Sequence, residues 1–384
     1  MEKEEKINQL QYLRKPQGTF QLLRYPARKK ETLRAWDAAD EYILDHLEQL
    51  EQDFSSILII NDSFGVLSVT LAEHSPVMWS DSYLAQQGML ANLSRNKINI
   101  SQVKFINSLE HPDNLFDLVL IKIPKSLAQL EDQLFRLKRH IKDSTVIIAA
   151  GMVKSVHTST LKLFESIIGS TSTSRAVKKA RLIFCQPDMN LPTSMSPYPS
   201  EYRLENTPYI ISNHASVFSR ESLDIGTRFL LQHIPAMQHV NRIIDVGCGN
   251  GIVGIIAAER NPQAQITFID ESYMAVDSAK TNFTRAFDNN RTANFLVSDC
   301  LNQVEDNSTD LILINPPFHQ HNAMGDSTAW QMFREAGKAL KQGGEVWVIG
   351  NRHLAYHTKL KRIFGNYVNI ASNKKFAILK ALKR

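Results

Sequence analysis

The C-terminal half of the chain contains the sequence Arg242-Ile-Ile-Asp-Val-Gly-Cys-Gly-Asn-Gly251, a short apolar run that leads into closely spaced glycines. An apolar stretch long enough for a helix, Ile252 to Arg260, follows at once. A strand that turns into a helix through glycines is typical of the first unit of an open α/β sheet. Glycine suits this turn because it adopts backbone conformations closed to other residues and leaves room for a ligand.

The rest of this half alternates short β-branched runs with helical patterns, which is typical of a mostly parallel sheet covered by helices. Strands are predicted at residues 242–246, 265–269, 294–297, 310–314 and 345–349. Helices are predicted at residues 252–260, 273–287 and 329–340. A small hairpin with strands at 201–204 and 209–212 is expected to precede this sheet.

The N-terminal half repeats the same plan. Gly65 matches Gly251 at a spacing of 186 residues, and later matches have spacings of 190, 193 and 200 residues. The slow growth of the offset is what small loop insertions produce, so the series predicts two tandem α/β domains from an internal duplication. We assign residues 1–185 to the first domain, 186–200 to a proline-rich linker and 201–384 to the second domain.

Positive charge is segregated along the 384-residue chain, although the formal net charge is only +5. Residues 133–185 contain ten Lys and Arg residues but only two acidic ones. No acidic residue follows Glu345, whereas nine basic residues do: Arg352, Lys359, Lys361, Arg362, Lys374, Lys375, Lys380, Lys383 and Arg384. Segregated positive charge predicts contact with a polyanion, although solvated helix faces explain any one cluster equally well.

The sequence favours a cytoplasmic protein with no membrane segment. The first residues are charged and lead into no apolar stretch of the kind found in secretory signals. No run approaches the roughly 20 apolar residues of a membrane span. The three cysteines, Cys185, Cys248 and Cys300, fit neither a disulfide framework nor a metal site. We therefore expect no metal, and nothing implies an obligate protein partner.

The glycine-rich sequence leaves two cofactors open. Residues 249–254 also fit the G-x-G-x-x-G pattern of NAD-dependent enzymes, in which the loop serves a pyrophosphate. S-adenosylmethionine instead carries an ammonium and a sulfonium, and Asp245 directly before the glycines suits such a cation. Asp270, at the end of the second strand, is expected to accept hydrogen bonds from ribose hydroxyls. Asp299 follows the third strand, where it either meets the adenine amine or lies in a surface turn or helix cap.

The fourth predicted strand ends in Asn315-Pro-Pro-Phe318. Two prolines fix φ and remove amide donors, so the nearby carbonyls remain available as acceptors. The side-chain oxygen of Asn315 and the carbonyl of Pro316 are expected to hold both hydrogens of an amino group and to aim its nitrogen at a methyl group. Phe318 would stack on a nucleobase. The motif therefore predicts an amine methyltransferase, since a dehydrogenase has no use for it.

These residues carry a resemblance to a known family. Residues 245–251 together with residues 315–318 resemble the class I, Rossmann-like amino-methyltransferases, whose sheets have seven mostly parallel strands. The duplicated plan and the sequence Val217-Phe-Ser-Arg-Glu-Ser-Leu-Asp-Ile-Gly-Thr227 are similar to bacterial ribosomal RNA guanine-N2 methyltransferases with paired halves. Trp36-Asp-Ala-Ala-Asp-Glu-Tyr42 and Lys178-Lys-Ala-Arg181 make the chain more similar to the large-subunit type than to the small-subunit type.

The resemblance implies roles for individual residues in the second half. Those expected to line S-adenosylmethionine are Asp245, Gly247, Gly249, Gly251, Asp270 and Asp299, with Phe218 and Asp224 at its methionine end. Those expected to hold the guanine are Asn315, Pro316, Pro317 and Phe318.

The first half departs from the family pattern. It reads Asn61-Asp-Ser-Phe-Gly65 at the glycine loop and Lys122-Ile-Pro-Lys125 at the catalytic motif. A lysine cannot accept hydrogen bonds from an amine, so this half is expected to be inactive and to bind RNA. The expected RNA contacts are Lys122, Lys125, Lys178, Lys179, Arg181 and, in the second half, Arg352.

The expected reaction is methylation of N2 of one guanine in 23S ribosomal RNA by S-adenosylmethionine. Guanine-N2 methylation of 16S ribosomal RNA, N6-adenine methylation of RNA or DNA, and glutamine methylation of a release factor share the catalytic motif and remain alternatives. A nucleic-acid-binding scaffold without catalysis is an alternative of a different class.

Overall fold

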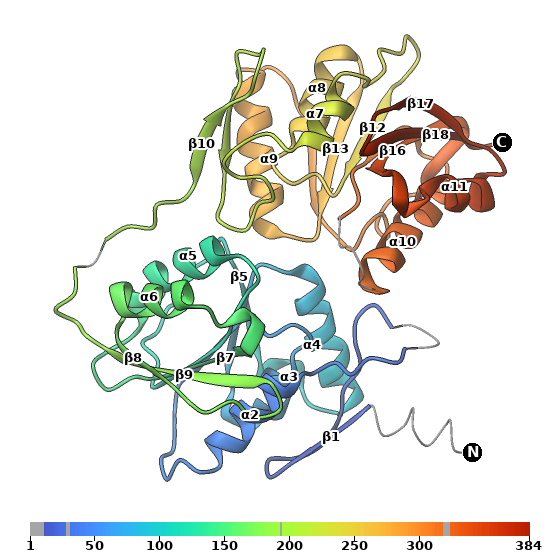
Figure 1. The fold of residues 1–384 in the computed structure, drawn as a ribbon. Helices are drawn as coiled ribbons and strands as arrows, with labels where there is room; N and C mark the ends of the chain where they lie inside the picture. The colour runs from blue at the N-terminus through green and yellow to red at the C-terminus, as the bar shows by residue number, and fades with distance from the viewer. Residues whose placement is uncertain (1–10, 28–30, 193, 318–322) are drawn as a thin grey trace, which may run out of the picture. The chain divides into compact units, whose positions relative to one another are not determined.

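The computed structural model describes residues 11–27, 31–192, 194–317 and 323–384. The chain divides into two compact units, Met1–Pro197 and Tyr198–Arg384, which we call the N-terminal and the C-terminal unit (Figure 1). Strand β9 (Ala180–Pro187) includes two residues that the sequence analysis assigned to the linker. Within the described residues, no helix combines the length and the apolar character that crossing a membrane requires.

The N-terminal unit contains a seven-stranded sheet with the order β5-β4-β3-β6-β7-β9-β8. Its strands are β1 (Tyr12–Lys15), β2 (Gly18–Gln21), β3 (Ile57–Ile60), β4 (Val77–Ser80), β5 (Lys104–Asn107), β6 (Leu118–Lys122), β7 (Val146–Met152), β8 (Gly169–Thr173) and β9, of which β1 and β2 form a separate hairpin. Its helices are α2 (Ala38–Leu47), α3 (Val66–Thr70), α4 (Tyr83–Arg95), α5 (Leu127–Leu137) and α6 (Thr158–Ile167), with short 3-10 helices η1 (Ala72–His74), η2 (Ile100–Gln102), η3 (Lys138–His140) and η4 (Val153–Ser155).

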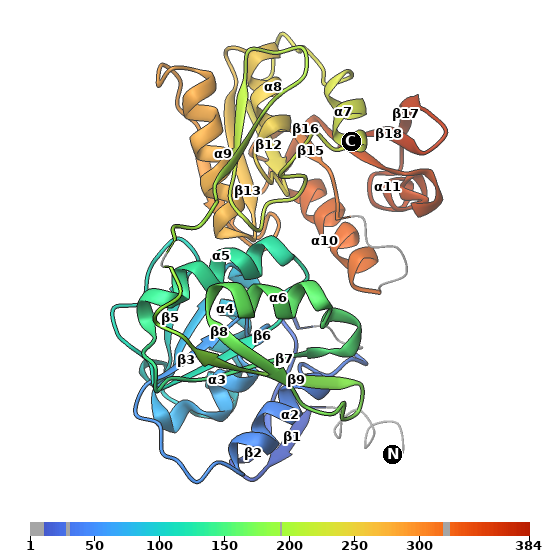
Figure 2. The ribbon, with the colours of Figure 1, turned by 60° about the vertical axis from the view of Figure 1, so that its left-hand side comes forward.

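Both faces of this sheet are buried because successive residues of a strand point to opposite faces. Ile57 and Ile59 of β3 pack in one core with helices α2, α3 and α4. Leu58 and Ile60 pack in a second core with helices α5 and α6 (Figure 2). The continuous apolar run of β3 is therefore explained by burial on both faces, as in other parallel sheets.

The C-terminal unit has the strand order β14-β13-β12-β15-β16-β18-β17. Its strands are β10 (Ser200–Arg203), β11 (Ile210–Asn213), β12 (Arg242–Val246), β13 (Gln265–Asp270), β14 (Asn294–Val297), β15 (Thr309–Ile314), β16 (Leu340–Asn351), β17 (Val368–Ser372) and β18 (Phe376–Leu382). Its helices are α7 (Ile225–Leu231), α8 (Ile252–Arg260), α9 (Tyr273–Ala286), α10 (Ala323–Ala339), the 3-10 helix η5 (Arg352–Leu354) and α11 (Tyr356–Phe364). Helices α7, α8 and α9 cover one face, and α10 and α11 cover the other (Figure 1).

The two sheets share one topology, in which five strands pair in parallel and the strand beside them, β18 or β9, is antiparallel to both of its neighbours. The prediction of two mostly parallel seven-stranded α/β sheets is thus confirmed. In the C-terminal unit, β12 lies between β13 and β15, so the strand order reverses at the carboxyl end of β12. Open α/β sheets bind their ligands at this edge.

Candidate active site

The glycine loop between β12 and α8 is held against the end of β13. The amides of Gly247 and Cys248 both donate to the carbonyl of Ile269, at 2.8 and 3.0 Å. Gly247, Gly249 and Gly251 have φ angles of 69°, 53° and 81°. This is the left-handed region, which glycine enters without steric cost. The loop conformation therefore depends on the glycines that the sequence analysis singled out.

The glycines of this loop meet different surroundings. A Cβ on Gly251 would lie 2.9 Å from the Cβ of Ala279, and a Cβ on Gly254 would lie 2.2 Å from the ring of Phe268. A Cβ on Gly249 would meet no atom within 4 Å in the part of the chain that the structure describes. Packing within the protein therefore explains the small size of Gly251 and Gly254, but not that of Gly249. Open space beside Gly249 is what a cofactor lying on the loop needs.

Asp245 is 2 % exposed at the start of the loop. Its Oδ2 accepts a hydrogen bond from the amide of Gly254 at 2.8 Å. Burial, with a smaller contribution from the negative charge of Asp270, raises the pKa of Asp245 to about 7. A neighbouring cation would stabilise the charged form of this buried carboxyl group and lower its pKa.

Asp270 joins the second strand to the glycine loop. Its two carboxylate oxygens accept hydrogen bonds from the amides of Gly249, at 3.0 Å, and Ser272, at 3.1 Å. The structure thus brings together Asp245, Gly249 and Asp270, three of the residues predicted to line the cofactor. Asp299 is 5 % exposed, which differs from a surface turn, and its Oδ1 accepts from Nε2 of Gln331 at 3.0 Å.

The motif predicted to be catalytic, residues 315–318, begins at the end of β15. Nδ2 of Asn315 donates to Oγ1 of Thr227 at 3.0 Å. Oδ1 of Asn315 is buried and, among the residues that the structure describes, has no hydrogen-bond partner. A buried acceptor without a partner costs free energy of folding, so a ligand that donates a hydrogen bond to this oxygen would recover that cost. Pro316 is buried and Pro317 is exposed, whereas Phe318 lies outside the described residues.

Thr227 is a site residue that the sequence analysis missed. Its amide and its hydroxyl both lie near Oδ2 of Asp224, at 2.8 and 3.3 Å, and Asp224 caps helix α7. An aspartate three residues before a threonine is a recognisable capping pattern, but it gives no hint of the contact with Asn315. Phe218, predicted at the methionine end of the cofactor, is 62 % exposed.

The thiols of Cys248 and Cys300 are not suited to act as nucleophiles. Burial raises the pKa of Cys248 and of Cys300, which keeps both thiols protonated and poorly nucleophilic. Across the residues that the structure describes, no group of His, Cys, Asp and Glu side chains could hold a metal ion.

The corresponding sheet edge of the N-terminal unit is filled by an ion-pair cluster. Nζ of Lys122 lies 2.9 Å from Asp37 and 2.7 Å from Asp40, and its side chain is 12 % exposed. Burial opposes the charge of Lys122, but the two carboxylates outweigh it and raise its pKa. The charge of Lys122 is therefore already paired inside the protein, and a contact with RNA would compete with these two carboxylates.

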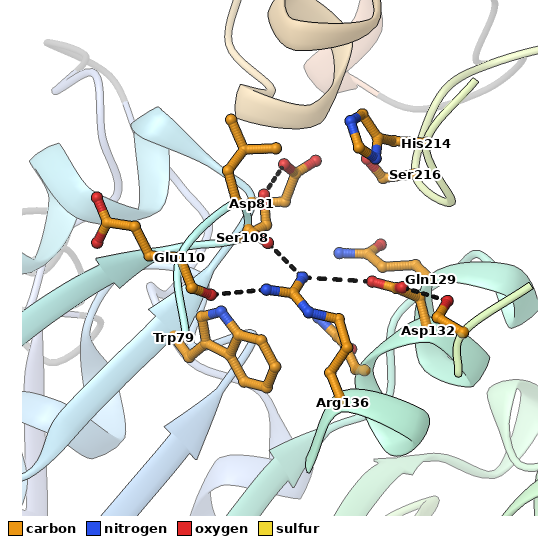
Figure 3. A network of polar contacts seen from close by, with 12 residues as sticks. Trp79, Asp81, Ser108, Glu110, Gln129, Asp132, Arg136, His214 and Ser216 are labelled. Carbon is orange, nitrogen blue, oxygen red and sulfur yellow. Dashed lines mark hydrogen bonds and ion pairs between the residues drawn. The ribbon is translucent and has the colours of Figure 1, made fainter. Parts of the chain in front are cut away.

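A second cluster surrounds Arg136 at the same edge (Figure 3). The guanidinium lies 4.8 Å from the ring of Trp79, donates to the backbone carbonyls of Ser108 and Glu110, and pairs with Asp132 at 3.5 Å. Side chains of the unit itself therefore occupy the region that follows β4 and β5.

The other predicted RNA contacts lie nearer the surface. Lys125, Lys179 and Arg352 are exposed, and Arg181 is half-buried. The side chain of Lys178 is 69 % exposed but pairs with Glu41 at 2.9 Å. Lys125, Lys179 and Arg352 therefore remain the best placed to meet a polyanion.

Comparison with known proteins covers both units. Residues 10–189 match the family model described as RLMG N-terminal domain, and residues 208–380 match the methyltransferase small domain. A relative from Streptomyces griseus, named ribosomal RNA large subunit methyltransferase G, is 49% identical over 96% of this chain and 98% of its own length. One of the same name from Aeromonas salmonicida is 47% identical over 94% of this chain and 97% of its own. A T. thermophilus 16S rRNA N2 methyltransferase, solved with AdoMet and guanosine, matches the fold with a TM-score of 0.74 at 19% identity, over 97% of both chains.

Proposed function

Because the chain belongs to the family of ribosomal RNA large subunit methyltransferase G, we propose that it methylates the exocyclic N2 amine of one guanine in 23S ribosomal RNA, with S-adenosylmethionine as methyl donor. The name that the relatives carry supports a large-subunit substrate. The structural neighbour is an N2 methyltransferase that was solved with AdoMet and guanosine, which supports the guanine amine and the cofactor.

The observation that carries the proposal is the unpartnered Oδ1 of Asn315. It is a buried acceptor at the carboxyl end of β15, next to the strand that leads into the glycine loop. An exocyclic amine offers the N–H donor that this oxygen lacks. An adenine or a glutamine side chain also offers such a donor, so it is the family that favours guanine.

The residues of the glycine loop fit S-adenosylmethionine. The open space beside Gly249 would accommodate the cofactor, Asp245 would hold its ammonium and Asp270 would accept from its ribose. We assign Asp299 to the adenine amine, with Gln331 orienting its carboxylate. When bound, S-adenosylmethionine supplies an electrophilic methyl group.

Asn315 would orient the guanine amine. Its Oδ1 accepts one N–H, and the carbonyl of Pro316 is proposed to accept the other, which points the nitrogen lone pair at the methyl group. As the N–C bond forms and the methyl group parts from the sulfonium, which would leave as a neutral thioether, the amine gains positive charge and its hydrogens become stronger donors. Both acceptors would therefore stabilise the transition state more than the ground state. The amine then loses one proton to solvent, so no strong general base is needed.

The two units are proposed to descend from one duplicated domain, and the shared strand order supports this. The N-terminal unit would then have lost catalysis and bind RNA. Support comes from the ion pairs of Lys122 and the contacts of Arg136, which fill the edge where the other unit keeps its site. Lys125 and Lys179 are the proposed phosphate contacts of this unit.

The test is transfer of labelled methyl from S-adenosylmethionine to protein-free 23S and 16S ribosomal RNA, followed by nucleoside analysis. We expect labelled N2-methylguanosine in 23S RNA, and a rate about 100- to 1,000-fold lower for Asn315→Ala, since one placed hydrogen bond contributes that much in comparable sites. Label in 16S RNA or in N6-methyladenosine would replace the proposed substrate while keeping the methyltransferase.

A further inference from the structure

A concave pocket of about 560 Å³ in the C-terminal unit is lined by Arg352, His353, Lys374 and Lys375. All four side chains are exposed. Among the residues that the structure describes, none of the four forms an ion pair with a carboxylate, and no acidic residue follows Glu345 in the sequence. The pocket therefore presents basic groups whose charge the protein does not neutralise.

Backbone hydrogen bonds fix the shape of this pocket. Oδ1 of Asn373 accepts from the amides of Lys375 and Phe376, each at 2.8 Å, and closes the turn that carries both lysines. The amide of Arg352 donates to the carbonyl of Lys375 at 3.0 Å and ties this turn to η5. The positions of the basic residues are thus set before a ligand binds, which lowers the entropy lost on binding.

The pocket lies at the same sheet edge as the candidate active site. Strand β16 runs parallel to β15, so Arg352 after β16 and Asn315 after β15 follow strands that end at one edge of the sheet. Phe376, which follows Lys375, packs against the first turn of α7: a Cβ on Gly226 would lie 3.1 Å from its ring. Gly226 precedes Thr227, which binds Asn315. The ring of Phe376 and the first turn of α7 therefore connect the pocket to Asn315.

We propose that this pocket binds a backbone phosphate of the RNA substrate, on a nucleotide that flanks the target base. A phosphodiester is a compact anion with acceptor oxygens only, which matches a pocket of basic donors, and arginine can bind it through two parallel hydrogen bonds. Phosphate contacts fix the register of a nucleic acid on a protein. A phosphate held beside Asn315 would place the strand so that one base reaches the acceptor oxygen. The inference rests on the proposed function for its RNA substrate.

The test compares the double variant Arg352→Ala/Lys374→Ala with a control that removes the same charge elsewhere, Lys338→Ala/Lys361→Ala. Lys338 and Lys361 are exposed and lie in the last turns of α10 and α11, towards the opposite edge of the sheet. The measurements are the Kd for 23S ribosomal RNA over a series of salt concentrations, the Kd for S-adenosylmethionine, and kcat, all on the full chain.

We expect the pocket variant to bind RNA about five- to tenfold more weakly per lost contact at 0.1 M salt, and the slope of log Kd against log salt to fall by roughly 0.7 to 0.9 per contact. Binding of S-adenosylmethionine should stay unchanged, whereas kcat should fall, because the target base is no longer held in register. An unchanged RNA Kd, or an equal loss in the control, would overturn the inference. Because RNA binding is measured without methyl transfer, a wild-type chain that binds RNA but methylates another base refutes only the proposed function.

Discussion

The side-chain amide of Asn315 donates to the hydroxyl of Thr227 at 3.0 Å, and Asp224 fixes the direction of this bond. The hydroxyl of Thr227 has a single hydrogen, which it gives to Oδ2 of Asp224 at 3.3 Å. Thr227 can therefore only accept from Asn315. Nδ2 of Asn315 must face α7, which leaves Oδ1, without a partner in the described part of the chain, for the proposed substrate amine.

Removing the hydroxyl of Thr227 should therefore slow the reaction without weakening cofactor binding. Thr227→Val keeps the side-chain shape but leaves Nδ2 of Asn315 without its acceptor, so the amide loses its fixed orientation. We expect kcat to fall about 10- to 100-fold, the loss typical of a misplaced catalytic group, with an unchanged Kd for S-adenosylmethionine. Thr227→Ser, which keeps the hydroxyl, should restore most of the rate. A serine variant as slow as the valine variant would contradict the orienting role.

The contacts of Asn315 and Lys122 separate what the sequence predicts from what it does not. Asn315 was predicted at its observed place, because an apolar β-branched run followed by two prolines marks the end of a buried strand. Its partner Thr227 lies 88 positions away, and only the fold brings the two together. The ion pairing of Lys122 was not predicted for the same reason. Its partner Asp37 is 85 positions distant, at the start of a helix that the sequence analysis had not identified.

Two glycine substitutions should separate cofactor binding from folding. Gly249→Ala places a methyl group in the open space beside the loop, so we expect the Kd for S-adenosylmethionine to rise at least about tenfold, while the strain of a left-handed alanine costs about 1 kcal/mol of stability. Gly254→Ala meets the ring of Phe268, which stacks on Phe295 at 5.1 Å, and should cost about 2 kcal/mol through overpacking. Calorimetry and urea unfolding measure the two effects. Unchanged cofactor affinity in Gly249→Ala would rule out the proposed position of the cofactor.

Lys122→Met should destabilise the N-terminal unit and leave RNA binding intact. The substitution removes the cation that pairs with Asp37 and Asp40. A buried carboxylate that loses its ion-pair partner lowers the free energy of unfolding by about 3 kcal/mol. Urea unfolding gives the free energy, and filter binding gives the RNA Kd of the folded variant. Lys125→Glu is the matched test at the surface, where we expect weaker RNA binding and little change in stability. Weaker RNA binding by Lys122→Met without a loss of stability would instead indicate that Lys122 contacts RNA.

Binding of S-adenosylmethionine should weaken below neutral pH because of Asp245. Burial raises the pKa of this carboxyl to about 7 in the free protein, so it is largely protonated at pH 6. The cationic cofactor requires the charged form, so binding at pH 6 must first release a proton. We expect the Kd to rise about tenfold between pH 7.5 and pH 6, with proton release visible as a dependence of the calorimetric enthalpy on the buffer.

The raised pKa of Asp245 also makes the free energy of unfolding depend on pH. This dependence is opposite in direction to that of cofactor binding, because it favours low pH. An ordinary Asp loses its proton near pH 3.8, whereas Asp245 in the folded chain keeps it up to about pH 7. Folding therefore takes up a proton between these values, and the contribution of Asp245 to the free energy of unfolding falls as the pH rises from about 4 to about 7. Asp245→Asn cannot ionise, so at pH 8 it should be at least as stable as the wild type and yet bind S-adenosylmethionine far more weakly. A variant that keeps both cofactor affinity and its pH dependence would show that Asp245 does not face the ammonium.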